Sequence, residues 1–192
     1  MGVILDIIGS FIVRASVVLL VITAMVNLNN SLFRQTERVA LNDQVLGAVE
    51  TISNDLSLAG YGLSTSKVFA VDDSIETSFS ADLDNDGTTE IVRYYLGAGA
   101  SGSHRILYRT LNAGTAFEIA RDVILLRFYY YNITGGTVTG TNGTIPANTI
   151  KSVKVSITIE SNHKLNSIYS GSSDSTSYQK AVWEGHIFPK NL

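Results

Sequence analysis

The feature that most constrains this chain is an almost unbroken apolar run near its start. Residues Val3 to Val26 contain only two charged side chains, Asp6 and Arg14. As an α-helix this run would span roughly 36 Å, enough to cross the hydrocarbon core of a bilayer. A cleavable secretory signal would instead have a basic start, a shorter apolar stretch and a small-residue cleavage site. The run therefore predicts a retained membrane or filament-core helix. A buried core helix of a soluble protein is the alternative.

The helical pattern continues past this run but changes character. Between Leu41 and Ala59 the apolar residues recur three or four positions apart, as on one face of an amphipathic helix. The glycines of Gly60-Tyr61-Gly62 are typical of a helix C-terminus. The polar residues between the apolar positions predict a solvated face: Asn42, Asp43, Gln44, Glu50, Ser53, Asn54 and Asp55.

We therefore expect one helix from about Val3 to Ala59, roughly 85 Å long. Residues 1–30 would form its hydrophobic transmembrane or filament-core half, and residues 31–62 its amphipathic half. The second half needs one face covered, because an amphipathic helix buries its apolar stripe against another element.

Residues 63–192 have the pattern of a β-rich globular domain that could cover this stripe. Short β-branched and aromatic runs alternate with clusters of Gly, Ser, Thr and Asn, which predict loops such as Gly97–Ser103. The fold class is thus α+β, with the long N-terminal α-helix packed on a C-terminal antiparallel β-sheet domain. The predicted strands are Lys67–Val71, Ile75–Ser80, Glu90–Leu96, Arg105–Thr110, Phe117–Ala120, Val123–Ile133, Ser152–Glu160 and Ala181–Phe188.

Composition excludes several classes of function. With 14 Lys and Arg against 17 Asp and Glu, the chain lacks the basic excess of a nucleic-acid-binding protein. It has no cysteine, which excludes disulfides, thiolate zinc sites and cysteine nucleophiles. Sequence motifs of serine hydrolases, zinc proteases and P-loop proteins are absent as well. We therefore expect no enzymatic activity.

One acidic segment, Asp82–Glu90, has the residue types of a metal-binding loop. Its Asp residues stand at alternate positions before a glycine, and an acid occupies the ninth position, a pattern that suits a hard cation such as Ca²⁺. The alternative is a polar hairpin turn in which the Asp side chains bind their own backbone. Calcium is the only cofactor that the sequence suggests. The candidate ligands are Asp82, Asp84, Asp86, Thr88 and Glu90.

Four segments, in this order along the chain, carry a family resemblance: SNDLSLAGYGL (53–63), ADLDNDGTTEIVRYYL (81–96), IKSVKVSITIES (150–161) and IFPKNL (187–192). They resemble the end of the long helix, an Asp/Asn/Gly-rich hairpin with a Tyr-Tyr strand, an alternating Val/Ile strand and the closing residues of W-type minor pilins of type IV filaments. The pseudopilins of type II secretion share much of this pattern.

The resemblance implies a structural subunit that is anchored in the bacterial inner membrane and assembles through its N-terminal helix into a cell-surface or extracellular filament. Its partners would be membrane lipid before assembly, and afterwards copies of itself or other pilin subunits. The alternative is a membrane-anchored binding or adhesion module that never polymerises. The family leader ends in Gly, with Glu fifth in the mature chain, whereas cleavage after Gly2 here would leave Asp6 fourth.

Asp6 and Arg14 are the candidate assembly residues. In one helix they would be about 12 Å apart along the axis and roughly 80° apart around it, too far for a good direct bond. Charges inside an apolar segment are costly and are usually paired or functional. Asp6 of one subunit could therefore meet Arg14 of a staggered neighbour. In the resembling family the early acid pairs with a neighbour's N-terminal amine, which is a competing partner for Asp6. The remaining alternative is that each charge extends to a membrane interface.

Overall fold

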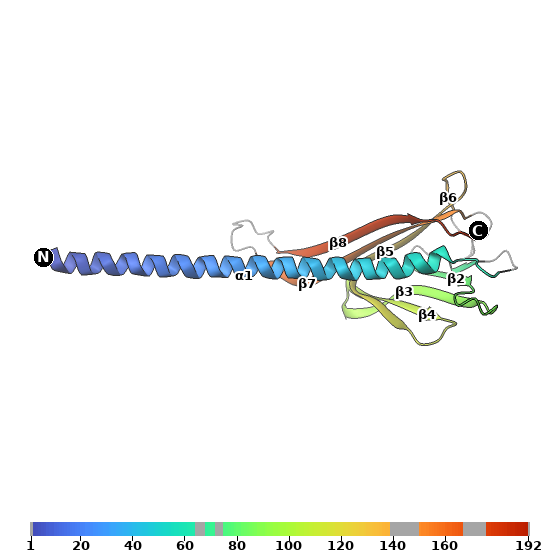
Figure 1. The fold of residues 1–192 in the computed structure, drawn as a ribbon, viewed down its shortest axis with the longest axis horizontal. Coiled ribbons are helices and arrows are strands. Elements are labelled where there is room, and N and C mark those ends of the chain that lie inside the picture. The colour runs from blue at the N-terminus through green and yellow to red at the C-terminus, as the bar shows by residue number, and fades with distance from the viewer. Residues whose placement is uncertain (1, 64–67, 72–74, 139–149, 167–175, 192) are drawn as a thin grey trace. The chain divides into compact units, whose positions relative to one another are not determined.

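The computed structural model describes residues 2–63, 68–71, 75–138, 150–166 and 176–191. Its elements are one helix, α1, followed by eight strands within these described ranges (Figure 1). Their bounds are α1 Gly2–Ser57, β1 Phe69–Val71, β2 Thr77–Ala81, β3 Glu90–Ser101, β4 His104–Leu111, β5 Phe117–Tyr131, β6 Thr137–Val138, β7 Ser152–Asn166 and β8 Thr176–Ile187.

The strands form one antiparallel sheet. The strand order is β1-β2-β3-β4-β5-β7-β8, and β6 pairs with β5. Each strand pairs with the strand before it in sequence, as expected where short connections join antiparallel strands, except that β7 pairs with β5 and not with β6. The predicted α+β class, with a long N-terminal helix packed on a C-terminal antiparallel sheet, is confirmed.

The chain divides into two compact units, Met1–Val39 and Ala40–Leu192. In the second unit, the predicted helix stripe from Leu41 to Ala59 is buried in the core. Ile52, Leu56 and Ala59 have no exposed surface at all. They join one hydrophobic cluster with sheet residues that include Phe79, Val92, Leu107, Leu126, Phe128, Val155, Ile157 and Ile159.

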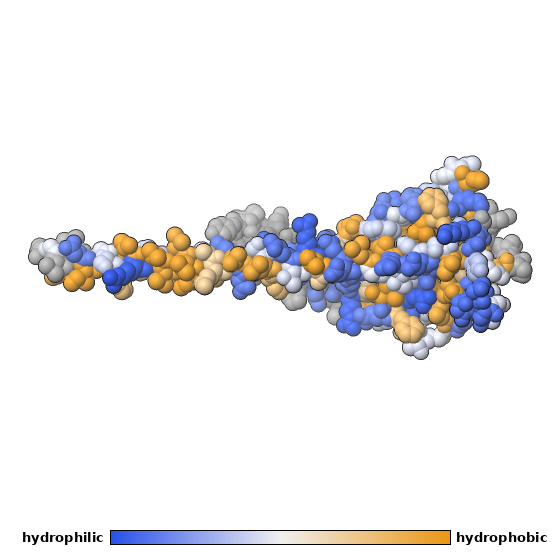
Figure 2. Space-filling view, in the orientation of Figure 1, coloured by the Kyte–Doolittle hydropathy of each residue, from blue (hydrophilic) through white to orange (hydrophobic). Residues whose placement is uncertain are grey.

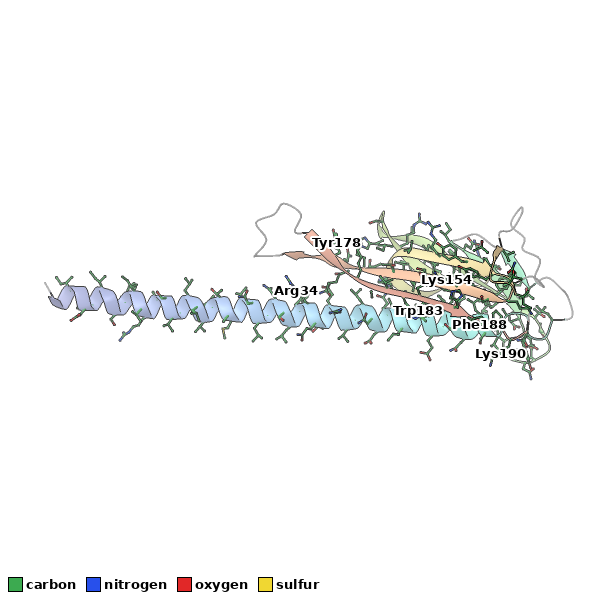
Figure 3. All side chains as sticks on the ribbon, turned by 90° about the horizontal axis from the view of Figure 1, so that it is seen from above. Arg34, Lys154, Tyr178, Trp183, Phe188 and Lys190 are labelled. Carbon is green, nitrogen blue, oxygen red and sulfur yellow. The ribbon has the colours of Figure 1, made fainter. Side chains whose placement is uncertain are left out.

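The two faces of the sheet differ in composition. On β5, Tyr130 is buried in the core on the helix side, whereas Tyr129, on the opposite face, is 41% exposed. On β7, the apolar side chains of Val153 and Val155 join the core, and Lys154 between them forms an ion pair with Glu184 on β8. Figure 3 labels Lys154 on this sheet. The face opposite the helix, called the outer face below, therefore carries polar and aromatic side chains.

Two predicted details are wrong. Asp55 does not lie on the solvated face of α1 but is buried, because a tyrosine and an arginine of the sheet bind its carboxylate. Nor is Gly97–Ser103 wholly a loop, since β3 continues to Ser101. Pairing with β4, in which Gly97 faces Ile106 and Ser101 faces His104, supplies the strand hydrogen bonds despite the glycines.

Two predicted strands, Phe117–Ala120 and Val123–Ile133, form one strand, β5. In place of the expected break, the strand has an irregularity: its register with β7 shifts after Val123, and Asp122 has a left-handed backbone with φ 55°. Such a bulge bends a strand without ending it.

The C-terminal end of α1 is tied to the end of the chain. The backbone N–H of Lys190 donates to the carbonyl of Ser57 at 3.3 Å, satisfying one of the carbonyls that a helix end leaves without a partner. Lys190 also brings a positive charge to the end of the helix where cations are favoured.

The first unit, Met1–Val39, is the N-terminal part of α1. Its large apolar side chains are exposed on all sides of the helix, including Phe11 at 73% and Leu20 at 70%. Figure 2 shows such hydrophobic residues along this part of the chain. The helix is long and apolar enough to span a membrane. A helix segment that is apolar all round, as residues 3–26 are, requires lipid or other protein around it.

Candidate functional site

The acidic loop joins β2 to β3. It brings three of the predicted ligands together, because ligand atoms of Asp82, Asp84 and Asp86 all lie within 4.8 Å of one another. Asp82 is buried, whereas Asp84 and Asp86 are exposed. Three carboxylates this close repel one another unless a cation or hydrogen-bond donors offset their charge.

Backbone N–H groups of the loop supply such donors. Asp82 accepts from Asp86 N through Oδ1 at 3.2 Å and from Gly87 N through Oδ2 at 3.0 Å. Asp84 accepts from Asp86 N, and Asp86 accepts from Thr88 N at 2.6 Å. These are the bonds expected of the polar-turn alternative.

The same bonds hold the carboxylates in place and leave each with acceptor capacity, since an ionised carboxyl group offers about four lone-pair positions. The donor set of hard oxygens therefore fits Ca²⁺. The loop as it stands satisfies both interpretations, and calcium binding stays a prediction.

The other two predicted ligands are placed differently. Glu90 Oε2 accepts a hydrogen bond of 2.9 Å from the backbone N–H of Leu83, and this bond closes the base of the loop. Thr88 is exposed, and its N–H binds Asp86. Among the described residues, the close acidic cluster thus contains the three Asp residues and not Glu90.

The turn that follows α1 contacts this loop, a connection that the sequence pattern does not reveal. Tyr61 donates its hydroxyl to Asn85 Oδ1 at 2.9 Å, and its carbonyl accepts from Asp82 N at 2.9 Å. A Cβ on Gly62 would lie 2.6 Å from Cβ of Asp82, so only glycine allows this approach. The conformation of the loop is thereby coupled to the end of the helix.

A buried polar network joins α1 to the same sheet. The carboxylate of Asp55 accepts three hydrogen bonds. Two come from Arg109, from Nε at 2.6 Å and from Nη2 at 3.2 Å, and the third comes from the Tyr94 hydroxyl at 2.6 Å. Burial, followed by the charge of Asp55 and the hydrogen bond to it, raises the pKa of Tyr94 well above its usual value. Burial lowers the pKa of Arg109, but the hydrogen bond and charge of Asp55 outweigh it and raise that pKa overall.

The network has the geometry of a structural link. All three groups are mutually satisfied, and Arg109 stays charged and Tyr94 neutral under ordinary conditions. Sequence reasoning missed it because Asp55 lies next to the apolar stripe, and nothing in the helical pattern shows which strand residue will face it.

The predicted assembly residues lie in the first unit. Asp6 and Arg14 both belong to α1 and are both exposed on the isolated chain. How their charges are compensated depends on what surrounds this part of the helix.

No protein-family model matches the chain, and no curated protein matches it significantly. The functional argument therefore rests on the residues themselves.

Proposed function

We propose that the chain is a pilin-like structural subunit that is anchored in the bacterial inner membrane and assembles through its N-terminal helix into an extracytoplasmic filament. The observation that carries this proposal is the burial pattern of α1. The helix is apolar on all sides over residues 3–26, and the large apolar side chains described there are exposed, yet from Leu41 onward one face of it is buried in the core of the β domain. Anchor and displayed domain thus share one helix.

In this proposal the first unit of the helix lies first in the membrane and then in the filament. In the membrane, lipid covers the apolar side chains of the first unit. In a filament, the equivalent helices of neighbouring subunits cover them, and association gains the packing contacts of closely fitted side chains. The β domain would then be displayed outside the membrane, and no catalytic step is part of this function.

Asp6 and Arg14 set the register in this proposal. An unpaired charge in an apolar assembly is costly, whereas an Asp–Arg pair between staggered neighbours offsets much of that cost. Apolar contacts supply the cohesion, and the pair selects the axial stagger of about 12 Å that eight helical residues span.

Charge exchange tests this role. We expect Asp6→Arg and Arg14→Asp each to abolish filaments seen by electron microscopy while the protein still fractionates with the membrane. The double exchange is expected to restore filaments in part, because opposite charges face each other again. Asp43→Arg, on an exposed helix position of the second unit, is the matched control and is expected to assemble.

Normal filaments from both single variants would contradict the pairing. If a scrambled order of the apolar residues in 3–26 also leaves surface display unchanged and no filament forms from the unaltered chain, the non-polymerising anchor is the correct function.

A further inference from the structure

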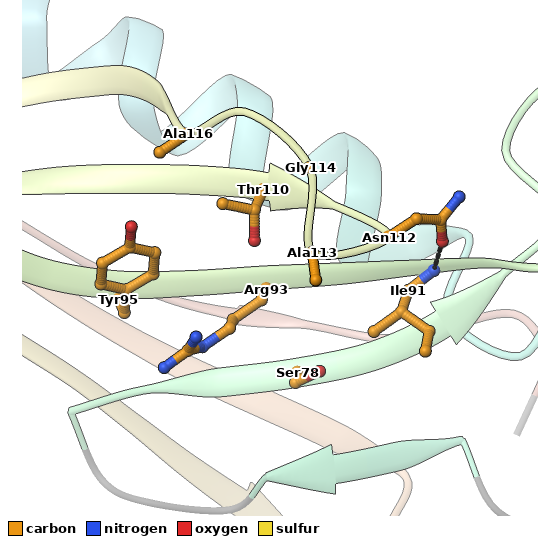
Figure 4. A pocket seen from close by; sticks show the side chains of 9 residues that line it. All are labelled: Ser78, Ile91, Arg93, Tyr95, Thr110, Asn112, Ala113, Gly114 and Ala116. Atoms are coloured by element: carbon orange, nitrogen blue, oxygen red, sulfur yellow. Dashed lines mark hydrogen bonds between the residues drawn. The ribbon is translucent and has the colours of Figure 1, made fainter.

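The outer face of the sheet carries a hollow of about 440 Å³ over β2, β3 and β4. Strand residues form its floor, and the β4–β5 connection, with Ala113, Gly114 and Ala116, passes over one side of it (Figure 4). Its volume lies within the range of small-ligand sites in proteins. The hollow lies on the face of the sheet opposite α1, so the helix does not fill it.

Two residues with hydroxyl groups contribute to the floor. Ser78 is 5% exposed and Thr110 is 7% exposed, and both line the hollow. Within the ranges that the structure describes, neither side chain makes a hydrogen bond. Although the two side chains are nearly buried, their hydroxyl oxygens are open to the hollow, where water can hydrogen-bond to them. A hydrogen-bonding ligand in the hollow can therefore take the place of water on these hydroxyls.

The rim adds hydrogen-bonding groups but no net charge. Arg93 binds Glu76 through Nε at 2.7 Å, so its charge is compensated within the chain. Its guanidinium also lies 4.7 Å from the ring centroid of Tyr95, which holds both side chains in place. A carboxylate or phosphate ligand would have to compete with Glu76, and this favours a neutral ligand.

The hollow also has a small apolar part. Ile91 is 47% exposed, and Ala113 and Ala116 of the β4–β5 connection line the hollow as well (Figure 4). The surface therefore combines scattered hydroxyl, amide and guanidinium groups with short apolar patches.

The hollow is also preorganised. Ile91 and Asn112 exchange two hydrogen bonds of 2.8 Å, one through the Asn112 side chain and one through its backbone N–H. Asn112 and Ala113 both have left-handed φ values, 50° and 56°, as in the tight hairpin turns that match strand twist. A site that keeps its shape loses little entropy when a ligand binds.

From this chemistry we infer that the hollow binds a neutral saccharide. A sugar ring presents several hydroxyls, which can pair with Ser78, Thr110 and the Asn112 amide, and C–H edges, which suit Ile91 and the two alanines. This binding site is independent of filament assembly.

The test uses the full chain in phospholipid nanodiscs and ligand-observed NMR with maltotriose, cellotriose, mannotriose and chitotriose as probes, and sialyllactose as the acidic counterpart. We expect at least one neutral trisaccharide to bind. Ala116→Trp is expected to abolish that binding, because the indole fills the hollow from an exposed position. Thr110→Val, which keeps the side-chain shape, is expected to weaken it by about three- to tenfold, as for one lost hydrogen bond.

Tyr129→Ala is the matched control, because this tyrosine lies on the same sheet face but outside the hollow. It is expected to leave affinity unchanged, and circular dichroism checks that every variant folds. Absence of binding by all four neutral probes, binding of sialyllactose alone, or full affinity in folded Ala116→Trp would each overturn the inference.

Discussion

The two units of this protein use one helix in opposite ways. In Met1–Val39 the apolar side chains of α1 are exposed, with Leu20 at 70%, whereas in Ala40–Leu192 the same helix buries Leu56 completely. Helix formation follows from local residue preferences and backbone hydrogen bonds, and both segments satisfy these. What differs is burial: within the second unit the sheet covers one face of the helix, whereas the apolar side chains of the first unit are exposed.

The charged residues of the two units also differ in burial and in where their partners come from. Asp55 is buried, and its partners, Arg109 and Tyr94, come from the same chain. Asp6 and Arg14 are exposed on the isolated chain, and under the proposed function their partners come from neighbouring subunits. A buried charge within a domain and an exposed charge in an apolar anchor thus face the same electrostatic requirement, met from different sources.

Leucine-to-alanine substitutions, one in each unit, test this contrast, and the one in the second unit is expected to have the largest effect on stability. Leu56→Ala is expected to lower the free energy of unfolding of the β domain by about 3 to 5 kcal/mol, because it removes buried contacts and leaves a cavity. Leu20→Ala is expected to leave that free energy unchanged. Chemical unfolding of the full chain in nanodiscs, followed by near-ultraviolet circular dichroism, measures both. Equal losses in the two variants would contradict the division into units.

Calcium tests the acidic loop, which belongs only to the second unit. If Asp82, Asp84 and Asp86 bind the ion, calcium in hundredfold excess over its dissociation constant is expected to stabilise the β domain by about 2.7 kcal/mol relative to chelator. Insertion of the first unit into membrane is expected to be unaffected. The fragment for melting experiments should begin at Ala40 and not at Leu63, since residues 41–59 contribute helix side chains to the core.

Asp84→Asn is the informative variant for this experiment. It keeps a side-chain oxygen for the backbone N–H of Asp86 but removes one charge. We expect it to reduce the effect of calcium while leaving the chelated protein as stable as before or slightly more stable, because like-charge repulsion is relieved. A melting temperature that is the same with calcium and with chelator would support the plain polar turn.

A smaller effect concerns alkaline pH and the Asp55 network. The folded pKa of Tyr94 is raised, so its contribution to stability is complete below the unfolded pKa of about 10. Above that pH the unfolded chain binds fewer protons than the folded one, and stability falls by about 1.4 kcal/mol per pH unit for this group.

Tyr94→Phe is expected to remove this part of the alkaline dependence. Tyr129→Phe, at an exposed position outside the network, is expected to keep it. Urea unfolding of residues 40–192 between about pH 9 and pH 11 measures the difference. An identical alkaline decline in Tyr94→Phe and the unaltered protein would show that Tyr94 ionisation is not coupled to folding.

Patterns with a short repeat were sufficient to predict much of the fold. The spacing of apolar residues from Leu41 to Ala59 determined which helix face enters the core, and Gly60-Tyr61-Gly62 marked where α1 ends. The alternation in Ser152–Glu160 located the core of β7. These features depend on residues close in sequence, whose relative directions are set by the 3.6-residue and two-residue periods of helix and strand.

Features that depend on long-range pairing required the tertiary structure. Asp55 is followed by 53 residues before Arg109, so its burial could not be read from the helix pattern. Glu90 has the spacing of a ligand, yet it binds Leu83 N because strand pairing at the start of β3 directs its side chain there. The hollow combines Ser78, Arg93 and Thr110 through the register of β2, β3 and β4. Sequence periodicity determines which face a side chain takes, whereas register determines which distant residue it meets.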